Sequence, residues 1–244
     1  MIYQYFLSAM KEGKKLLAIL LDPDKMNRET IVETIAKINS STVDFIFVGG
    51  SSVEEKATDE LVLKIKELTT LPIVLFPGNY QQITSHADAI LFLSLISGRN
   101  PEYLINQQVK AVPLLQETEL EVIPTAYILV DGGVETSVAR VSKTEPISPQ
   151  DEKTILNTAL AGAYMGNKLV YLEAGSGAKT PVPGTLIAEL RSQIDIPIIA
   201  GGGIRSHEQM AEAFESGADM VVIGTAFEQN PKILRQILKD EHIH

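Results

Sequence analysis

The feature that most constrains this chain is the alternation, from end to end, of short apolar runs with longer segments of helical period. Apolar runs bounded by turn residues are typical of buried strands, whereas apolar residues recurring every three or four positions are typical of helices. Regular alternation of the two predicts repeated βα units on a parallel sheet. We interpret as strands the runs 16–21, 44–49, 72–76, 89–95, 122–130, 169–173, 197–200 and 220–223.

About eight strands match the repeat number of a (β/α)8 TIM barrel, so the predicted fold class is α/β. An open doubly wound sheet is the alternative, but chemistry-bearing residues follow nearly every strand, which favours closure. Two clear signals start helices: Ser206 with Gln209 three positions later, and Pro231 after Asn230. The segments with helical patterning are 28–38, 53–68, 102–115, 151–164, 185–193, 207–216 and 231–238.

The repeat breaks in two places. The stretch after Phe76 is too short for a connection plus a full helix, which need about 10–12 residues or more, so a short helical or extended piece is expected to replace the third helix. The stretch 131–150 is long and polar and contains Gly132 and Gly133. Loops of that length are usually functional or mobile, so it is interpreted either as a lid or substrate-side loop or as a disordered surface insertion.

Composition sets the broad class of the protein. The chain has 244 residues, of which 45% are hydrophobic and 21% charged, and its formal net charge is −10. One soluble catalytic domain over 1–244 suits these values, because α/β barrels commonly reach ~200–250 residues undivided. Disordered, collagen-like and coiled-coil chains are excluded. The acidic balance also argues against nucleic acid as a partner, since affinity for phosphate backbones comes from clustered Lys and Arg.

Cysteine usage and the N-terminal segment indicate the compartment. The chain contains no cysteine, which excludes disulfides, thiolate-bound zinc and a cysteine nucleophile. Residues 1–15 mix charged and aromatic side chains and do not resemble a signal peptide. The apolar run 89–96 is less than half the ~20 residues needed to cross a bilayer. We therefore expect a cytoplasmic protein that does not span a membrane.

Glycine-rich segments follow the last three predicted strands, at 174–177, 201–203 and 224–225. In a parallel barrel every strand delivers its C-terminal end to the same rim, so these segments converge. Each one alone is better explained as a turn that needs positive φ. Three together indicate a phosphate cradle, because glycine lets backbone N–H groups approach an anion.

Oxygen donors follow the first two predicted strands, on the neighbouring side of the same rim. Asp22, Asp24 and Ser51 are hard ligands suited to Mg²⁺, which is typically held by one or two carboxylates with substrate phosphate and water. Asp22 is the better candidate because it stands directly at the strand end, whereas Asp24 caps or orients. The alternative is that Asp-Pro-Asp only turns the chain and caps the next helix.

Glu173 ends an otherwise apolar strand, where a carboxylate is expensive to desolvate unless it is paired or used. It is the candidate general base, and a structural pair with a Lys or Arg is the alternative. Tyr171 shares its face and either hydrogen-bonds a ligand or fills the barrel. The histidines show no metal-ligand spacing and are interpreted as surface or cap residues: His86, His207, His242 and His244.

The strand-end motifs, taken together, are similar to those of a known family. They read Leu-Leu-Asp-Pro-Asp-Lys at 20–25, Val-Gly-Gly-Ser at 48–51, Phe-Pro-Gly-Asn at 76–79, Tyr-Leu-Glu-Ala-Gly-Ser-Gly-Ala at 171–178 and Ala-Gly-Gly-Gly-Ile-Arg at 200–205. This set closely resembles the geranylgeranylglyceryl phosphate synthase family along the whole chain, and 171–177 is its most distinctive part. One branch of that family has a lysine where this chain has Leu20, so the chain is nearer to the archaeal and Bacteroidetes branch.

The resemblance implies a Mg²⁺-dependent prenyltransferase. Such an enzyme transfers a polyprenyl group, here expected to be geranylgeranyl, from its diphosphate to sn-glycerol 1-phosphate, which forms an ether bond and releases diphosphate. The family's magnesium positions match Asp22 and Ser51. Its catalytic and glycerol phosphate positions match Tyr171, Leu172, Glu173, Ala174, Gly175, Ser176, Gly177, Gly202, Gly203, Gly224 and Thr225. The family forms dimers and hexamers, so a homo-oligomer is expected, and the resemblance allows transient membrane contact during product release.

Several assignments stay open at the level of sequence. Residues 89–96 and Tyr127 are candidates for a prenyl groove, but barrel packing explains them equally well. An FMN-dependent oxidoreductase barrel would use the same phosphate cradle and would be yellow. A phosphosugar isomerase or lyase barrel would need neither a prenyl substrate nor a strict metal, and a non-catalytic phosphate-binding barrel would be indifferent to the loss of Glu173.

Overall fold

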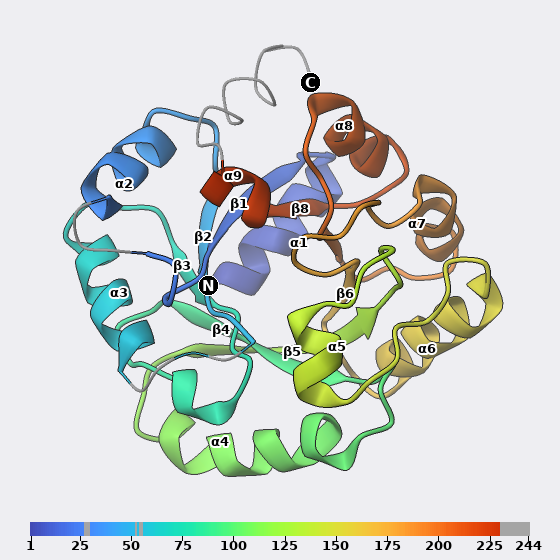
Figure 1. The fold of residues 1–244 in the computed structure, drawn as a ribbon, viewed down its shortest axis with the longest axis horizontal. Helices are drawn as coiled ribbons and strands as arrows, with labels where there is room; N and C mark the ends of the chain where they lie inside the picture. Colours follow the sequence, from blue (N-terminus) through green and yellow to red (C-terminus); the bar gives the residue numbers. More distant parts are fainter. Residues whose placement is uncertain (27–29, 52, 54–55, 230–244) are drawn as a thin grey trace.

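The computed structural model describes residues 1–26, 30–51, 53 and 56–229. Within these residues, eight parallel strands close into a barrel in which each strand pairs with the next and the last pairs with the first (Figure 1). The strands are β1 (Leu16–Leu21), β2 (Phe45–Val48), β3 (Ile73–Leu75), β4 (Ala89–Leu95), β5 (Glu121–Leu129), β6 (Leu169–Glu173), β7 (Ile198–Gly201) and β8 (Met220–Ile223). The predicted (β/α)8 barrel is confirmed, and the open sheet is wrong.

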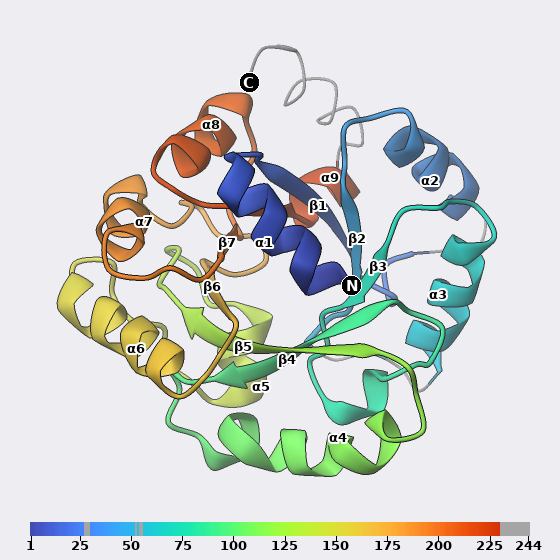
Figure 2. The same ribbon diagram turned by 180° about the vertical axis from the view of Figure 1, so that it is seen from behind.

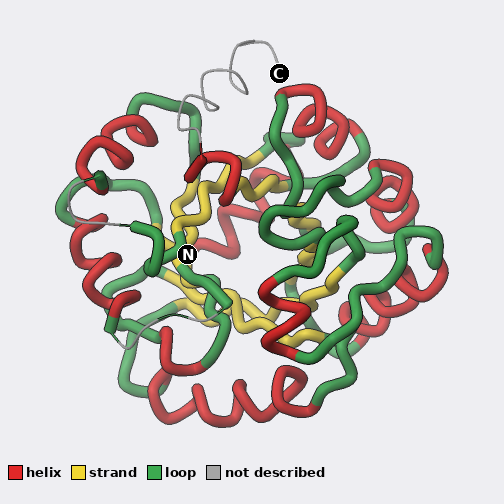
Figure 3. The backbone as a smooth tube through the Cα atoms, in the orientation of Figure 1, coloured by secondary structure: helices red, strands yellow, loops and turns green. Residues whose placement is uncertain are grey.

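Most of the helices form a ring around the strands, whereas the first lies across one end of the barrel and two short ones lie near the other end (Figure 3). The helices are α1 (Ile2–Glu12), α2 (Ile31–Asn39), α3 (Ala57–Lys66), α4 (Gln107–Leu115), α5 (Ser137–Ser142), α6 (Glu152–Tyr164), α7 (Gly184–Arg191), α8 (His207–Glu215) and α9 (Thr225–Gln229), with a 3-10 turn η1 (Tyr80–Gln82) and a π-helical turn η2 (Glu102–Asn106). In the described part of the chain, no helix is long and apolar enough to cross a bilayer. The predicted helix 231–238, its start at Asn230 and Pro231, and His242 and His244 lie outside the described residues.

Alternation along each strand divides the core into two layers. In β6, Tyr171 points into the barrel, whereas Val170 and Leu172 pack between the sheet and the helices. The cause is the period of two in a strand, which sends successive side chains to opposite faces. Residues of the inner layer that lie at the C-terminal end of a strand are therefore placed to line a site.

The helix α1 closes the N-terminal end of the barrel (Figure 2). Its Phe6 and Ala9 are buried in the inner core, and the Phe6 ring packs against Phe45 of β2 at a centroid distance of 5.1 Å. The N–H groups of Ile2 and Tyr3 donate to the carboxylate of Glu121. Because α1 covers the N-terminal end, an active site is expected at the opposite, C-terminal end of the barrel.

The third helix of the repeat is replaced, as predicted. Between β3 and β4, where every residue is described, the chain forms the single turn η1. The side chain of Asn79 starts this turn by accepting a hydrogen bond from the Gln81 N–H at 2.8 Å. In place of a full helix, this turn lines one side of an apolar groove that runs along β4.

The stretch 131–150 is an ordered part of the rim and contains α5. Thr136 caps α5, because its Oγ1 accepts a hydrogen bond from the Ala139 N–H at 3.2 Å. The Gly132 carbonyl accepts from the Lys179 N–H at 2.8 Å, which ties the stretch to the segment after β6. This packing agrees with a substrate-side loop and not with a disordered insertion.

Candidate active site

A cavity opens at the C-terminal ends of the strands. Its space is about 1190 Å³, which includes part of the open mouth. The predicted site residues that line it are Asp22, Ser51, Tyr171, Glu173, Gly175, Ser176, Gly177, Gly202, Gly203, Gly224 and Thr225. They come from five different strand ends and meet because all strands are parallel in a closed barrel.

Leu172 and Ala174 do not line this cavity. Both side chains are buried in the outer layer, between the sheet and the helices. The period of two places them on the opposite face from Tyr171 and Glu173. The structure therefore does not bring these two predicted glycerol phosphate residues into the site by their side chains.

Glu173 ends β6 and points into the barrel with only 6% of its surface exposed. Its Oε1 accepts a hydrogen bond of 2.6 Å from the Gly175 N–H. Gly202 lies so close that a Cβ there would stand 2.4 Å from the same oxygen. Among the described residues, no Lys or Arg forms an ion pair with Glu173, so the alternative of a structural pair finds no support there.

Burial raises the pKa of Glu173 to about 7, because the charged carboxylate loses its hydration in this dry position. The Gly175 N–H and the Tyr171 hydroxyl lower the pKa and offset only part of this effect. A carboxyl group that titrates near neutrality is well matched to accept a proton during catalysis. The geometry and the pKa together support Glu173 as the general base.

The raised pKa of Glu173 predicts a pH dependence of stability. Between its ordinary pKa of 4.5 and about 7, the folded protein binds this proton more tightly than the unfolded chain does. The contribution to the free energy of unfolding is therefore complete below pH 4.5 and is lost as the pH rises through about 7. Urea unfolding at several pH values between 4.5 and 7 should show that the free energy of unfolding falls more steeply with pH in the wild type than in Glu173→Gln. If the free energy of unfolding changed with pH in the same way in both proteins, the raised pKa would be contradicted.

Three aromatic rings lie against one another on the floor of the cavity. The centroids of Phe76, Tyr127 and Tyr171 are 5.1 to 5.6 Å apart. Both tyrosine hydroxyls are buried, and that of Tyr127 has no hydrogen-bond partner within the described part of the chain. Burial, and next the Glu173 carboxylate, raise the pKa of both tyrosines well above the usual value. Tyr171 therefore fills the barrel and also keeps a protonated hydroxyl near Glu173.

The loops after β6, β7 and β8 meet on one wall of the cavity. The Ser176 and Thr225 hydroxyls are 2.7 Å apart and share a hydrogen bond, which joins the first of these loops to the last. Arg205, which follows β7, donates to the Gly177 carbonyl at 3.2 Å. The predicted glycine-rich segments are thus one continuous surface, suited to an anion by its backbone N–H groups and hydroxyls.

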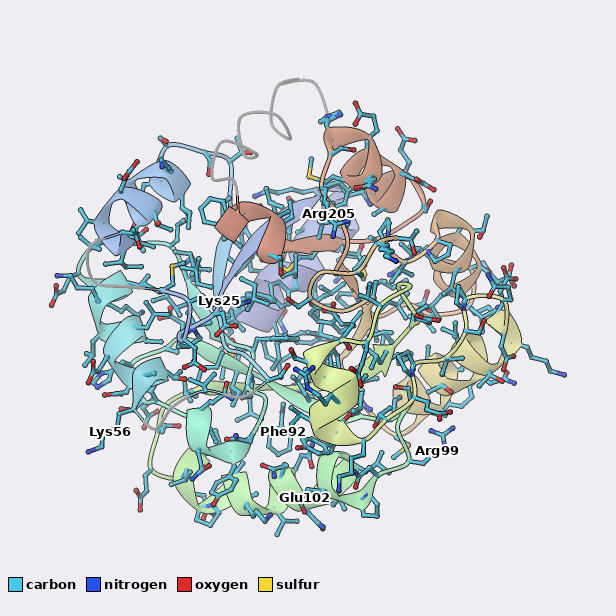
Figure 4. The ribbon with its side chains drawn as sticks, in the orientation of Figure 1. Lys25, Lys56, Phe92, Arg99, Glu102 and Arg205 are labelled. Atoms are coloured by element: carbon cyan, nitrogen blue, oxygen red, sulfur yellow. The ribbon has the colours of Figure 1, made fainter. Side chains whose placement is uncertain are left out.

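Lys25 and Arg205 line the cavity, although sequence reasoning assigned them no role. Lys25 Nζ lies 3.1 Å from Asp22 Oδ2, and the Arg205 N–H donates to Gln209 Oε1 at 2.8 Å. Figure 4 shows Lys25 on the side of the barrel formed by β1 and β2, and Arg205 toward α8. Each belongs to a strand-end motif, at 20–25 and at 200–205, and this position was the sequence signal that could have identified it. In a chain of net charge −10, both place positive charge where an anionic substrate would enter.

Asp22 and Ser51 stand at the ends of β1 and β2, on the other wall. Asp22 Oδ1 accepts a hydrogen bond from the Asp24 N–H at 3.2 Å, so this aspartate turns the chain and lines the cavity at once. A Cβ on Gly50 would stand 2.9 Å from that oxygen, so the missing side chain lets the carboxylate lie beside the Ser51 segment. The described residues contain no group of three or more His, Cys, Asp and Glu that could enclose a metal. The donor set fits Mg²⁺ held jointly with substrate oxygens.

An apolar groove of about 750 Å³, open solvent included, adjoins the polar cavity. The residues that line both are Gly50, Ser51, Phe76, Tyr127 and Val138. The groove runs along β4, where Leu91, Phe92, Leu93 and Leu95 of the predicted run line it, and is closed by η1, α4 and α5. Figure 4 shows Phe92 on the α4 side of the barrel. His86 and His207 lie outside both cavities, as predicted, and His207 begins α8.

A closed barrel with a buried carboxylate and glycine-rich strand ends at its C-terminal rim belongs to the class of (β/α)8 barrel enzymes. Residues 9–241 match the PcrB family. The chain is 55% identical to the geranylgeranylglyceryl phosphate synthase of Flavobacterium johnsoniae, over 94% of each chain, and 42% identical to that of Thermococcus gammatolerans, over 95% of this chain and 91% of the other. This protein belongs to the PcrB family, and its predicted place among the geranylgeranylglyceryl phosphate synthases is confirmed.

A solved structure supports the same conclusion. The (S)-3-O-geranylgeranylglyceryl phosphate synthase of Thermoplasma acidophilum, in complex with its substrate sn-glycerol-1-phosphate, superposes with a TM-score of 0.92 at 37% identity. The match covers 98% of this chain and 97% of that one. The likeness therefore extends over the whole barrel, including the rim on which the cavity lies.

Proposed function

We propose that this protein transfers a geranylgeranyl or similar polyprenyl group from its diphosphate to sn-glycerol 1-phosphate, with Mg²⁺, forming an ether bond and releasing diphosphate. The observation that carries this proposal is the shared wall between the polar cavity and the apolar groove. Joining a phosphate ester to a hydrocarbon needs both compartments to meet at the reacting carbon. A phosphosugar isomerase or a flavin-dependent barrel would need the polar cavity but no groove for a hydrocarbon chain.

The wall formed by the β6, β7 and β8 loops is the proposed glycerol phosphate site. Its support is the hydroxyl pair of Ser176 and Thr225, the glycine backbone around it and the Arg205 guanidinium. A phosphate held there leaves the glycerol chain directed toward Glu173, which lines the same cavity. Fixing the phosphate in this way turns the attack of the hydroxyl into a step between bound groups.

Glu173 would take the proton in the proposed reaction. The primary hydroxyl oxygen of glycerol phosphate forms a bond to the first carbon of the prenyl chain, the bond from that carbon to diphosphate oxygen breaks, and the hydroxyl proton goes to Glu173. When held by Asp22 and Ser51, Mg²⁺ would neutralise the charge of the leaving diphosphate. Lys25, which lines the cavity beside Asp22, adds positive charge on the same wall.

The apolar groove is the proposed site of the prenyl chain. Leu93 is half-buried in its wall, so Leu93→Gln, with a side chain of similar size, places an amide against the hydrocarbon. Such a group costs about 1–3 kcal/mol in apolar surroundings, so KM for geranylgeranyl diphosphate should rise ~10-fold or more, with KM for sn-glycerol 1-phosphate unchanged. The control is Leu63→Gln, because Leu63 is 42% exposed on α3. Steady-state kinetics with each substrate varied would contradict the assignment if both variants behaved alike.

The whole proposal is tested by incubating the purified protein with Mg²⁺, labelled sn-glycerol 1-phosphate and geranylgeranyl diphosphate, followed by lipid extraction. Label should enter the organic phase with metal and stay in water with EDTA. Label that stays aqueous with several prenyl lengths would refute the transferase. A flavin absorbance in the purified protein would favour the oxidoreductase barrel instead.

A further inference from the structure

Gln82 is a buried polar residue in the turn that replaces the third helix. Only 3% of its surface is exposed. Its Oε1 accepts hydrogen bonds from the N–H groups of Gly50 and Gly78, at 3.3 and 3.2 Å. Its Nε2 donates to the Gly50 carbonyl at 2.8 Å. One side-chain amide thus satisfies both polar groups of Gly50 and joins the loop after β2 to the loop after β3.

The two loops are also in direct backbone contact. A Cβ on Gly78 would lie 2.3 Å from the Gly50 carbonyl oxygen and 2.9 Å from the Cα of Ser51. A Cβ on Gly49 would lie 1.9 Å from the Phe76 carbonyl oxygen. These distances leave no space for side chains between the loops. The segment 49–50 therefore has no side chains of its own to hold it: the Gly49 N–H donates to the Leu21 carbonyl at 3.2 Å, and the amide of Gln82 holds both polar groups of Gly50.

Gly50 connects this packing to the proposed diphosphate wall. Its Cα faces the Asp22 carboxylate, since an added Cβ would be 2.9 Å from Oδ1, and Ser51 follows directly in the chain. Gly50 and Ser51 line both the polar cavity and the apolar groove. A shift of the Gly50 peptide would therefore change the separation between the Asp22 carboxylate and the Ser51 hydroxyl.

We propose that Gln82 is the positioning residue of the diphosphate half of the site: it fixes Gly50 and Ser51 against Asp22, so that carboxylate and hydroxyl are held ready for a metal-bound diphosphate. The proposal rests on the proposed function and assigns a task to the shortened third connection. The side-chain hydrogen bonds of Gln82 go to the β2 and β3 ends, whereas the glycerol phosphate half is built on β6, β7 and β8. The effect of Gln82 is therefore specific to one substrate.

The test compares Gln82→Met with Gln81→Met. Methionine is close to glutamine in length and volume but removes the amide, and Gln81 is the exposed neighbour in the same turn. Calorimetry measures binding of Mn²⁺ with inorganic diphosphate, and separately binding of sn-glycerol 1-phosphate. Gln82→Met should weaken Mn²⁺-diphosphate binding by ~10–100-fold, the usual effect of losing a partner that orients a metal ligand. Binding of sn-glycerol 1-phosphate should be unchanged, and Gln81→Met should match the wild type in both.

Kinetics and stability separate positioning from general damage. In Gln82→Met, KM for the prenyl diphosphate should rise and KM for sn-glycerol 1-phosphate should not. The proposal would be overturned if Gln82→Met lost affinity for both ligands equally, or if it bound Mn²⁺-diphosphate as tightly as the wild type does. It would also be overturned if the wild type did not bind Mn²⁺-diphosphate. If Gln82→Met does not fold, Gln82→Asn replaces it with the same expected loss, because its amide is one methylene shorter and does not reach both polar groups of Gly50. A wild type that makes no lipid product, with the selective binding loss still present, would refute the reaction and leave the positioning role intact.

Discussion

Replacing Glu173 by Gln is expected to lower turnover by ~10²–10⁴-fold, the usual range for losing a general base. Glutamine keeps the shape of the side chain and can still accept the hydrogen bond from the Gly175 N–H, so the loop after β6 stays in place. The amide cannot take up the hydroxyl proton at neutral pH. The native carboxyl can, because burial raises its pKa to about 7 and makes it a stronger base than an exposed glutamate.

The measurement is single-turnover formation of lipid product, together with calorimetric binding of sn-glycerol 1-phosphate, which should be largely kept in Glu173→Gln. The control is Glu215→Gln, because Glu215 is exposed at the end of α8, and it should behave as the wild type. A Glu173→Gln protein with wild-type turnover would remove the general base from the mechanism and favour a barrel that binds its ligand without chemistry.

Gly202→Ala is expected to be the second most damaging substitution. Gly202 has φ of +78°, in the left-handed region, and a Cβ there would stand 2.4 Å from Glu173 Oε1 and 2.5 Å from the Gly175 nitrogen. The backbone conformation alone costs about 1–2 kcal/mol of unfolding free energy for a non-glycine residue. The methyl group must also displace the carboxylate or the loop after β6. A displacement of about 1 Å at a reacting group can cost ~10²-fold in rate.

The matched control for Gly202→Ala is Gly13→Ala. Gly13 ends α1 with φ of +70°, and an added Cβ would meet nothing within 4 Å. It therefore reports backbone strain without a clash, so thermal or urea unfolding should show a similar loss of stability while turnover stays at the wild-type level. Equal turnover in the two variants would show that the close approach of Gly202 to Glu173 has no catalytic importance.

Much of the barrel is predictable from the sequence because strand signals are local. The predicted bounds of β1, β4, β6 and β8 agree with the structure, since each is a dense apolar run, and β1, β6 and β8 also end at or just before a charged residue or glycine. The start of α8 is also confirmed, because Ser206 Oγ accepts a hydrogen bond from the Gln209 N–H at 3.3 Å. The helices α1 and α5 were not predicted, since the first precedes the repeat and the second lies within a polar stretch.

The site was predictable as far as strand ends define it. Closure of a parallel barrel is enough to bring Asp22, Ser51 and Glu173 to one cavity. What the sequence did not reveal depends on contacts between distant segments. Gln82 looks like any polar residue in a short turn, and only the fold shows that its amide reaches Gly50, 32 positions away. Such a contact leaves no periodic or compositional signal.

The replaced third helix has a consequence for how the protein resists heat. A regular barrel would bury an outward-facing side chain of β4 such as Phe92 beneath that helix, whereas here Phe92 lines a groove of about 750 Å³, open solvent included. The folded chain forgoes the stabilisation from that burial, ~25 cal/mol for each Å² left uncovered. A hydrocarbon that fills the groove restores it and, by binding only the folded state, raises the unfolding temperature by mass action. If the groove holds the prenyl chain as proposed, the protein without this substrate is the less stable form, and binding of the substrate raises its unfolding temperature.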